Sequence, residues 1–448
     1  MVRALPVVKR STGSPTSRVQ GCDHSVGLAA AEDPRPFSPQ WKPVRLALAK
    51  NMRILRFRAA ASISMVLVGG SPVASSAAPH RAAMMVCTPS AVILKSSRVG
   101  SEEVQAKALN DRGDIVGFAD NSDPKDKAIH AILWRNGKAG SAVDLGVLPG
   151  YVASEAYGVN NNRVVFGLLY DKKKRTFPFR WKAGRMTVLK GPNGRRQQAD
   201  VPDRNTINDR GQMAGTLIIA GQRQAVRWSP DGKATLLPAL PGHTWTNVWS
   251  INSDGVVSGW SRKQPNEDGE NNPVIWDTSG KVVPLKTAPG RADGAAQATN
   301  RSGLTVGYLG NLGTDGIPGA VNTDPERDNA VVWHSRTARP RLLGRPALPH
   351  AYAELVDIND RGQGAGMSGN FTKTGFPLFA PAIWRTGWTS LRPLPIPEAS
   401  QKSRVVIAML NDINNRGDIV GDIYGLDAKD FSKVRRIDAV LWRCPFSR

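Results

Sequence analysis

Residues 108–117 read ALNDRGDIVG, and residues 411–421, near the other end of the chain, read NDINNRGDIVG. Both copies place an Asn directly after an apolar residue and a Gly seven positions later. The same pairing occurs seven times, at Asn110/Gly117, Asn160/Gly167, Asn208/Gly215, Asn252/Gly259, Asn300/Gly307, Asn359/Gly366 and Asn414/Gly421. Successive Asn anchors lie 44 to 59 residues apart. A repeat of this length indicates tandem units of short strands.

Each anchor is followed by one Trp inside a short apolar run, such as AILWR around Trp134 and AVLWR around Trp442. Short apolar runs bounded by turn residues and without helical periodicity are typical of buried strands. We therefore expect one buried strand around each of Trp134, Trp181, Trp228, Trp276, Trp333, Trp384 and Trp442.

The anchors begin the tetrapeptide Asn-x-x-Gly, which has the residue preferences of a type I turn. A Gly in the left-handed conformation closes a three-residue hairpin loop with a bulge. We therefore expect Asn110–Gly113 and its equivalents to join two antiparallel strands. The second unit departs from the pattern because Arg163 stands where Gly is expected, and we expect Asn161 or Asn162 to supply the left-handed residue there.

A fourth strand is expected after the Trp strand, in short segments that end in Leu at 143–145, 186–189, 234–237, 282–285, 341–343 and 390–394. Four short strands per unit, punctuated by turns, are typical of a propeller blade. The seven units predict an all-β fold, a seven-bladed β-propeller over residues 86–448.

The seventh unit ends soon after Trp442 and has no room for its fourth strand. An isolated apolar run at residues 91–94 precedes the first unit, and Leu94 aligns with Leu189 of the second. We expect this N-terminal strand to complete the last blade, because a closed ring leaves no free sheet edge.

The repeat resembles the secreted HAF-type repeat family, whose units combine an apolar-Asn-x-x-Gly turn, a His/Pro-Ala-apolar-x-Trp strand and a Leu-Gly-containing exit. His130–Trp134 and Asp144–Gly146 match this pattern best, while the other units keep Asn, Gly and Trp but lose the His. The resemblance covers about residues 90–448. It implies an extracellular, β-propeller-like protein and says little about activity.

Two cysteines lie beyond the first 51 residues, Cys87 and Cys444. Aligned on the turn Lys182–Gly184 of the second unit, they fall on adjacent positions, where the last blade lacks a covalent turn. We expect them to form a disulfide, since an exported chain enters an oxidising compartment. Two unrelated free thiols are the alternative.

The N-terminal region differs from the repeats in composition. Residues 1–51 are rich in Pro, Arg and Ser, and we expect a non-native or disordered extension there. Residues 52–78 contain three Arg, an apolar stretch and small residues, the order of a secretory signal peptide. A buried core helix is the alternative for this stretch. We therefore expect a secreted or periplasmic protein, and no segment after residue 80 is apolar for long enough to span a membrane.

The chain is basic, with a net charge of +23, and residues 86–448 alone carry 48 basic and 34 acidic residues, a net charge of +14. The cations are scattered, and the longest run is Lys172–Arg175. We expect an unknown ligand, with an anionic envelope polysaccharide, attracted through summed potential, or a protein as candidates, and an ordinary solvated surface as the alternative. The charge pattern does not require nucleic acid, and we expect a monomer.

The loops between second and third strands vary most in length, and they share one face with the connections between blades. Irregular loops on a rigid scaffold commonly bind ligands. We expect a ligand on that face, near the axis, in contact with polar and aromatic residues among Glu155, His243, Trp245, Asp293, His350, Tyr352 and Glu354.

Catalytic signals are few in the sequence. Residues 86–448 contain four His, no HExxH motif and no Cys/His spacing typical of zinc sites. The segment 266–272, NEDGENN, offers oxygen ligands for calcium without the spacing of a calcium loop. We therefore expect no catalytic residues, no metal and no cofactor, and a non-catalytic binding module for a glycan, protein or small ligand. The alternative is an extracellular propeller hydrolase or lyase with an axial site.

Overall fold

The computed structural model describes residues 90–97, 101, 103–121, 128–202, 205–263, 270–310, 329–344, 351–371, 377–397, 405–427, 434–443 and 445–446. The extension at 1–51, the signal peptide at 52–78, His350, Cys87 and Cys444 lie outside these residues. Everything described below belongs to the compact unit that spans residues 37–448. No helix of the described part is long and apolar enough to cross a membrane.

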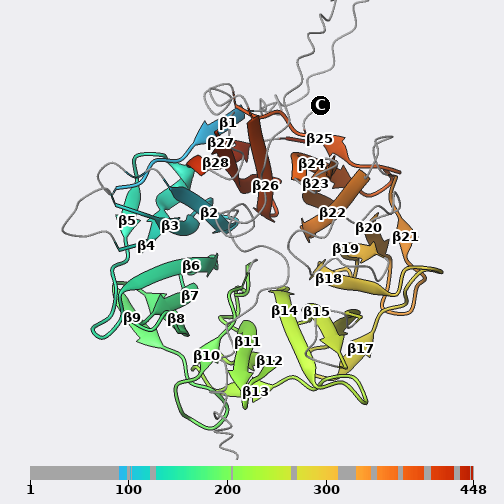
Figure 1. Cartoon of the computed structure of the whole chain (residues 1–448), viewed down its shortest axis with the longest axis horizontal. Coiled ribbons are helices and arrows are strands. Elements are labelled where there is room, and N and C mark those ends of the chain that lie inside the picture. Colours follow the sequence, from blue (N-terminus) through green and yellow to red (C-terminus); the bar gives the residue numbers. More distant parts are fainter. Residues whose placement is uncertain are drawn as a thin grey trace, which may run out of the picture. The chain divides into compact units, whose positions relative to one another are not determined.

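The described residues form seven four-stranded antiparallel sheets in a ring, so the predicted seven-bladed β-propeller is confirmed (Figure 1). Blade 1 contains β2 (Val104–Leu109), β3 (Ile115–Ala119), β4 (His130–Trp134) and β5 (Ala142–Asp144). Blade 2 contains β6 (Ala153–Val159), β7 (Val165–Tyr170), β8 (Thr176–Lys182) and β9 (Arg185–Val188). Blade 3 contains β10 (Gln198–Ala199), β11 (Met213–Ile219), β12 (Gln222–Trp228) and β13 (Ala234–Leu236). A single 3₁₀ turn at Arg135–Gly137 follows β4.

The other four blades repeat this order. Blades 4 and 5 contain β14 (Trp245–Ile251), β15 (Val257–Arg262), β16 (Asn272–Trp276) and β17 (Val282–Pro284); β18 (Asp293–Thr299), β19 (Thr305–Gly310), β20 (Asn329–Trp333) and β21 (Arg341–Leu342). Blades 6 and 7 contain β22 (Ala351–Ile358), β23 (Gln363–Phe371), β24 (Pro377–Arg385) and β25 (Arg392–Pro393); β26 (Val405–Ile413), β27 (Ile419–Leu426), β28 (Val434–Arg443) and β1 (Ser90–Ile93).

The Asn-x-x-Gly turns join the first and second strands as predicted. In blade 1 the N–H of Gly113 donates to the Asn110 carbonyl at 3.0 Å, and the N–H of Asn110 donates to the Asp114 carbonyl at 2.9 Å. Gly113 has φ +83°, the left-handed conformation that Gly adopts without steric cost.

The prediction for the second turn is wrong. Arg163 itself adopts φ +55°, so neither Asn161 nor Asn162 supplies the left-handed residue. The guanidinium of Arg163 donates from Nε to Asp114 of blade 1 at 2.8 Å, and this interaction offsets part of the strain that a side chain meets at positive φ.

In every blade except blade 3, the Gly seven positions after the anchor lies opposite a β-bulge in the first strand. In blade 1 the pairing shifts between Ala106 and Ala108, and a Cβ built on Gly117 would lie 1.8 Å from the Gln105 carbonyl oxygen. In the same way, a Cβ on Gly167 would lie 2.2 Å from the carbonyl oxygen of Glu155, and a Cβ on Gly259 would lie 1.9 Å from that of Asn247. The fixed interval in the sequence therefore reflects backbone approach at the bulge.

The repeated Trp residues form the core between blades. Six of the seven are at most 2% exposed, and Trp181 is 8% exposed. In five blades the indole Nε1 donates to a backbone carbonyl at the exit of the preceding blade, as from Trp228 to Lys190 at 2.8 Å. Each of these five Trp residues thus joins two consecutive blades by packing and by a hydrogen bond.

The N-terminal strand lies in the last blade. Strand β1 pairs with β28 in antiparallel register, with Ala91 opposite Trp442. Leu94 donates its N–H to Ala439 at 2.8 Å, as Leu189 does to Pro178, so Leu94 holds the fourth-strand position that the alignment predicts. That this pairing is what keeps the ring closed stays a prediction.

Replacing Leu94 with Ala tests the contribution of this strand. Leu94 is 1% exposed, so we expect Leu94→Ala to lower the free energy of unfolding in urea by about 2–5 kcal/mol. Leu236, a fourth-strand Leu that is 47% exposed, provides the control, and Leu236→Ala is expected to cost less than about 1 kcal/mol. Equal losses in the two variants would show that the N-terminal strand does not hold the ring.

Candidate functional site

The seven anchor side chains form a closed circle of hydrogen bonds around the axis, here called the asparagine ring (Asn110, Asn160, Asn208, Asn252, Asn300, Asn359 and Asn414). In each blade the amide Nδ2 donates to the backbone carbonyl of the anchor in the next blade, at 2.8 to 3.2 Å. The bond from Asn414 to Asn110 joins blade 7 to blade 1. The ring therefore links every pair of neighbouring blades.

The same amides also stabilise their own turns. Oδ1 of Asn414 accepts from the N–H of Arg416 at 3.0 Å and from that of Asp418 at 2.9 Å. This is the local side-chain-to-backbone bonding that makes Asn favourable in turns. One side chain thus shapes the hairpin through its oxygen and joins the neighbouring blade through its nitrogen.

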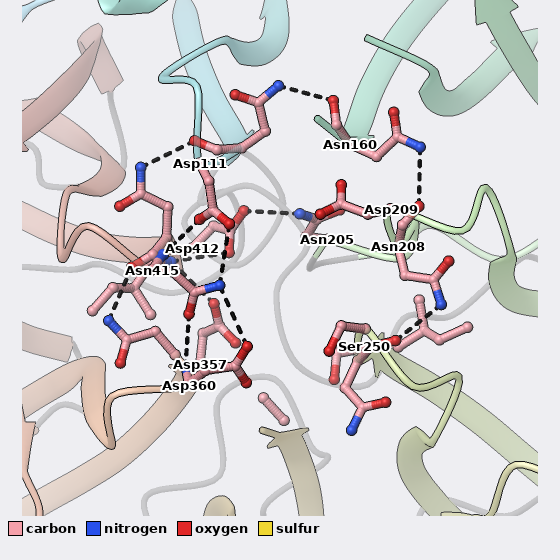
Figure 2. Close-up of a pocket in the computed structure, with 18 of the residues that line it drawn as sticks. Asp111, Asn160, Asn205, Asn208, Asp209, Ser250, Asp357, Asp360, Asp412 and Asn415 are labelled. Carbon is pink, nitrogen blue, oxygen red and sulfur yellow. Dashed lines mark hydrogen bonds between the residues drawn. The ribbon is translucent and has the colours of Figure 1, made fainter. Parts of the chain in front are cut away.

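A cavity of about 140 Å³ opens at the end of the ring where these turns lie, the turn end. One ordered water needs about 10–15 Å³ of such volume, so the cavity holds several waters or a small polar ligand. Its lining includes the asparagine ring and five carboxylates, Asp111, Asp209, Asp357, Asp360 and Asp412, and Figure 2 labels these five. No Lys, Arg or His is among the described residues that line it.

Six of the seven residues that directly follow an anchor, all except Arg301, line the mouth of this cavity. The N–H of Asn415 donates to Oδ1 of Asp111 at 2.7 Å, and the N–H of Asp360 donates to Oδ1 of Asn415 at 2.8 Å. The N–H of Asn161 donates to Asp209 in the same direction at 2.7 Å. These bonds fix the carboxylates that surround the opening.

Two aspartates from neighbouring blades meet deeper in the cavity. The N–H of Ile413 donates to Oδ1 of Asp412 at 2.9 Å and to Oδ2 of Asp357 at 3.0 Å. Oδ2 of Asp412 accepts from the N–H of Leu109 at 2.8 Å and from Nδ2 of Asn205 at 3.2 Å. Asp412 is 3% exposed.

Burial raises the pKa of Asp412 well above its usual range, and the charge of Asp357 and its hydrogen bond raise that pKa further. The N–H groups of Leu109 and Ile413 act in the opposite direction. Two carboxyls this close do not both ionise readily, so the pair retains a proton where exposed aspartates have lost theirs. A protonated and an ionised carboxyl side by side can donate and accept a proton in one reaction.

Of the seven residues predicted from sequence, the six that the structure describes lie toward the opposite end of the ring, here called the loop end, and none of these six lines this cavity. Trp245 lies between the guanidinium groups of Arg223 and Arg262, at 5.8 and 5.7 Å. Nδ1 of His243 lies 3.0 Å from Oγ of Ser261. Burial lowers the pKa of His243.

The predicted acids take separate places at this end. Oε2 of Glu155 accepts from the hydroxyls of Tyr157 at 2.5 Å and Tyr170 at 2.7 Å, and burial raises the pKa of Glu155. Oδ1 of Asp293 accepts from a backbone N–H at 2.8 Å. Glu354 is fully buried in β22.

Tyr352 is stacked on Phe379, with ring centroids 4.7 Å apart. His350 lies outside the described residues. These placements leave the predicted loop-end ligand site untested.

A sequence signal for the missed pair exists in the position two residues before each anchor. Five units have a small residue there: Ala108, Gly158, Thr206, Ser250 and Ala298. The last two units have Asp357 and Asp412. A large, ionisable residue in two consecutive copies, where the others are small, marks a departure from the purely structural repeat.

Possible metal ligands are dispersed in the described part of the chain. No group of three or more His, Cys, Asp or Glu side chains is placed there to hold a metal ion. Residues 264–269, which contain most of the segment considered for calcium, lie outside the described residues.

No family model and no curated protein matches this sequence. Solved structures do resemble the fold. The β-propeller domain of the Trilobed protease from Pyrococcus furiosus has 8% identity and a TM-score of 0.48 over 75% of this chain and 94% of that one. A puromycin-hydrolysing peptidase from Mycobacterium tuberculosis has 14% identity and a TM-score of 0.49 over 78% of this chain and 52% of that one.

An oligogalacturonate lyase from Vibrio parahaemolyticus has 10% identity and a TM-score of 0.47, with 80% of this chain and 98% of that one covered. This chain spans about half the length of the peptidase. At 8% to 14% identity and TM-scores below 0.5, these likenesses assign no activity to this chain.

The prediction that the chain is not an enzyme needs correction. It rested on the absence of catalytic motifs, yet propellers with this arrangement include peptidases and lyases. A propeller assembles its acids from different blades, so their proximity leaves no local motif in the sequence. The Asp357–Asp412 pair is an example, since its members lie 55 residues apart.

The raised pKa of Asp412 predicts how its replacement changes stability with pH. The native state binds this proton more tightly than the unfolded chain, so the carboxyl destabilises the fold progressively as pH rises above about 3.9, the unfolded pKa. Asp412→Asn removes that cost. In chemical denaturation, the variant's free energy of unfolding should improve relative to wild type between about pH 4 and pH 7.

Asp231 provides a control of opposite sign. A hydrogen bond from Ser229 lowers the pKa of this exposed carboxyl, so its stabilisation is present above the unfolded pKa and lost on acidification. The free energy of unfolding of Asp231→Asn should therefore fall relative to that of wild type as pH rises. Identical pH trends for the two variants would contradict the assigned shift at Asp412.

Proposed function

We propose that this chain is a hydrolase or lyase that acts on a glycan at the turn-end cavity, with Asp357 and Asp412 as its acid–base pair. The observation that carries the proposal is the contact of both carboxyls with the single N–H of Ile413, inside a polar cavity on the axis. The side chains of Asp357 and Asp412 are hydrogen-bonded to each other, and no Lys or Arg is among the described residues that line the cavity.

The two carboxyls supply the two proton transfers that either reaction needs. In hydrolysis the ionised carboxyl takes a proton from the attacking water, and the protonated carboxyl gives its proton to the leaving oxygen, as two carboxyls that share one proton can do. In elimination the ionised carboxyl takes a proton from carbon, and the protonated carboxyl again serves the leaving oxygen. The raised pKa keeps the donor protonated at a pH where an exposed Asp is ionised.

The lining favours a hydroxyl-rich substrate. Amides and carboxylates provide donors and acceptors side by side, which suits the hydroxyl groups of a sugar. The volume of about 140 Å³ fits a small polar group such as a chain end, and it does not fit an extended polymer. Because residues 52–78 have the composition of a signal peptide, we place the activity outside the cytoplasm, on envelope glycans.

Isosteric substitution of the pair tests this proposal. Asp357→Asn and Asp412→Asn keep the size of the side chains and remove the proton transfer, so each should reduce turnover by at least about 100-fold. The measurement is release of reducing ends or of unsaturated uronides from a panel of envelope glycans and aryl glycosides. Unsaturated uronides are formed by elimination and not by hydrolysis, so their release would identify a lyase.

Glu155→Gln is the matched control, since Glu155 is also a carboxyl with a raised pKa but lies at the loop end. It should leave turnover within about threefold of wild type. Loss of activity in Glu155→Gln with full activity in Asp357→Asn would move the active site to the loop end. Full activity in both aspartate variants would refute the acid–base role.

A further inference from the structure

Blade 3 departs from the other blades at its first strand. Strand β10 contains only Gln198 and Ala199, whereas the first strands of the other six blades contain six to nine residues. Pro202 follows soon after, and Pro cannot donate to a strand ladder. Next to the anchor, the described residues of this segment form one isolated bridge, between Ile207 and Met213.

The interrupted strand brings Asn205 to the axis. Its Nδ2 donates to Oδ2 of Asp412 at 3.2 Å, which joins blade 3 to blade 7 (Figure 2). The hydrogen bonds of the asparagine ring and of the cavity mouth join neighbouring blades only. Asn205 therefore crosses the cavity to reach a carboxyl that regular blade geometry would leave out of its range.

Blade 2 provides the space that this crossing needs. Gly158 occupies the position that Asp357 and Asp412 occupy in their own blades. A Cβ built on Gly158 would lie 2.9 Å from Oδ1 of Asn205 and 3.0 Å from Cγ2 of Ile207. Both distances are shorter than ordinary carbon contacts, so any side chain at 158 displaces the amide of Asn205.

We propose that Asn205 is a positioning residue of the axial site, which holds Oδ2 of Asp412 in a fixed orientation across the cavity. The proposal rests on the proposed function, because it assigns Asn205 to the same acid–base pair. Leu109 and Asn205 together occupy Oδ2 with N–H donors. Oδ1 lies on the side of the Ile413 N–H shared with Asp357, so proton exchange is directed to that side.

Other charged groups near Asp412 set the background for any titration. Asp357 on β22 is its partner, and Asp111, Asp209 and Asp360 line the same cavity from the turns. On β27, which pairs with the strand that carries Asp412, buried Asp422 forms an ion pair with Lys107 of β2 at 2.8 Å. Substitution of Asn205 changes none of these groups, so they contribute equally to the titration of wild type and of the variant.

Substitution of Asn205 should shift the titration of the pair. An N–H donor stabilises the ionised carboxyl, so its removal in Asn205→Ala should raise the apparent pKa of the pair by roughly half a unit to one unit. The measurement is ¹³C NMR of full-length protein labelled at the aspartate carboxyl carbons, with Asp412→Asn and Asp357→Asn used to assign the signals. No substrate is present, so the result does not depend on activity.

Gly158→Ala tests the same contact without changing Asn205. The added methyl should displace the amide and raise the pKa of the pair in the same direction. Asn161→Ala removes an amide that lines the cavity but donates to Asp111 and Asp209, and Gly140→Ala adds a methyl with no atom within 4 Å. Both controls should leave the titration of Asp357 and Asp412 unchanged.

The outcomes separate this inference from the proposed function. Upward shifts in Asn205→Ala and Gly158→Ala, with none in the controls, support the positioning role. An unchanged titration in Asn205→Ala refutes it, whatever the enzyme does. Once turnover of a glycan is measured, the acidic limb of its pH profile should move by the same amount in Asn205→Ala. If the pKa of the pair shifts upward in Asn205→Ala but Asp357→Asn is fully active, the proposed function is refuted and the positioning role of Asn205 stands.

Discussion

Seven asparagine amides, hydrogen-bonded in a circle, hold the inner ends of the blades together. Each amide uses its oxygen to shape its own turn and its nitrogen to reach the next blade, so turn geometry and ring closure depend on the same atoms. A buried amide that loses its partner costs about 1–3 kcal/mol. Since each bond requires the neighbouring turn to be in place, the ring favours the complete set of seven blades over partial assemblies.

The candidate site lies where the repeat is least regular. Regular copies have a small residue two positions before the anchor. A ring made only of such copies would have no ionisable side chain at this position. Blades 6 and 7 place carboxyls there, and blade 3 breaks its first strand to bring in Asn205, which lies beside the small Gly158 of blade 2. The two carboxyls and Asn205 line one cavity. Such a combination is expected where sequence serves function and not only stability.

Much of the fold could be predicted from sequence because its signals are local. The turn at Asn110–Gly113, the buried strand at Trp134 and the matching position of Leu94 all follow from patterns within a few residues. The partner of each anchor nitrogen is 44 to 59 residues away, or 304 for Asn414 and Asn110, and no local pattern reveals it. The Asp357–Asp412 pair could not be predicted for the same reason, since its members also lie far apart in the sequence. Arg163 was missed because its ion pair with Asp114 lies on another blade.

The most direct test of the central claim is the unfolding free energy of Asn414→Asp compared with Asn193→Asp. Asp keeps the oxygen that accepts the turn N–H groups but replaces the Nδ2 donor, so at 414 an oxygen faces the Asn110 carbonyl. Asn193 is exposed and accepts a similar N–H from Arg195 at 3.0 Å, outside the asparagine ring. We predict a loss of about 1–3 kcal/mol at 414 and a change within about 0.5 kcal/mol at 193. Equal effects at both positions would contradict the claim that the asparagine ring holds the blades together.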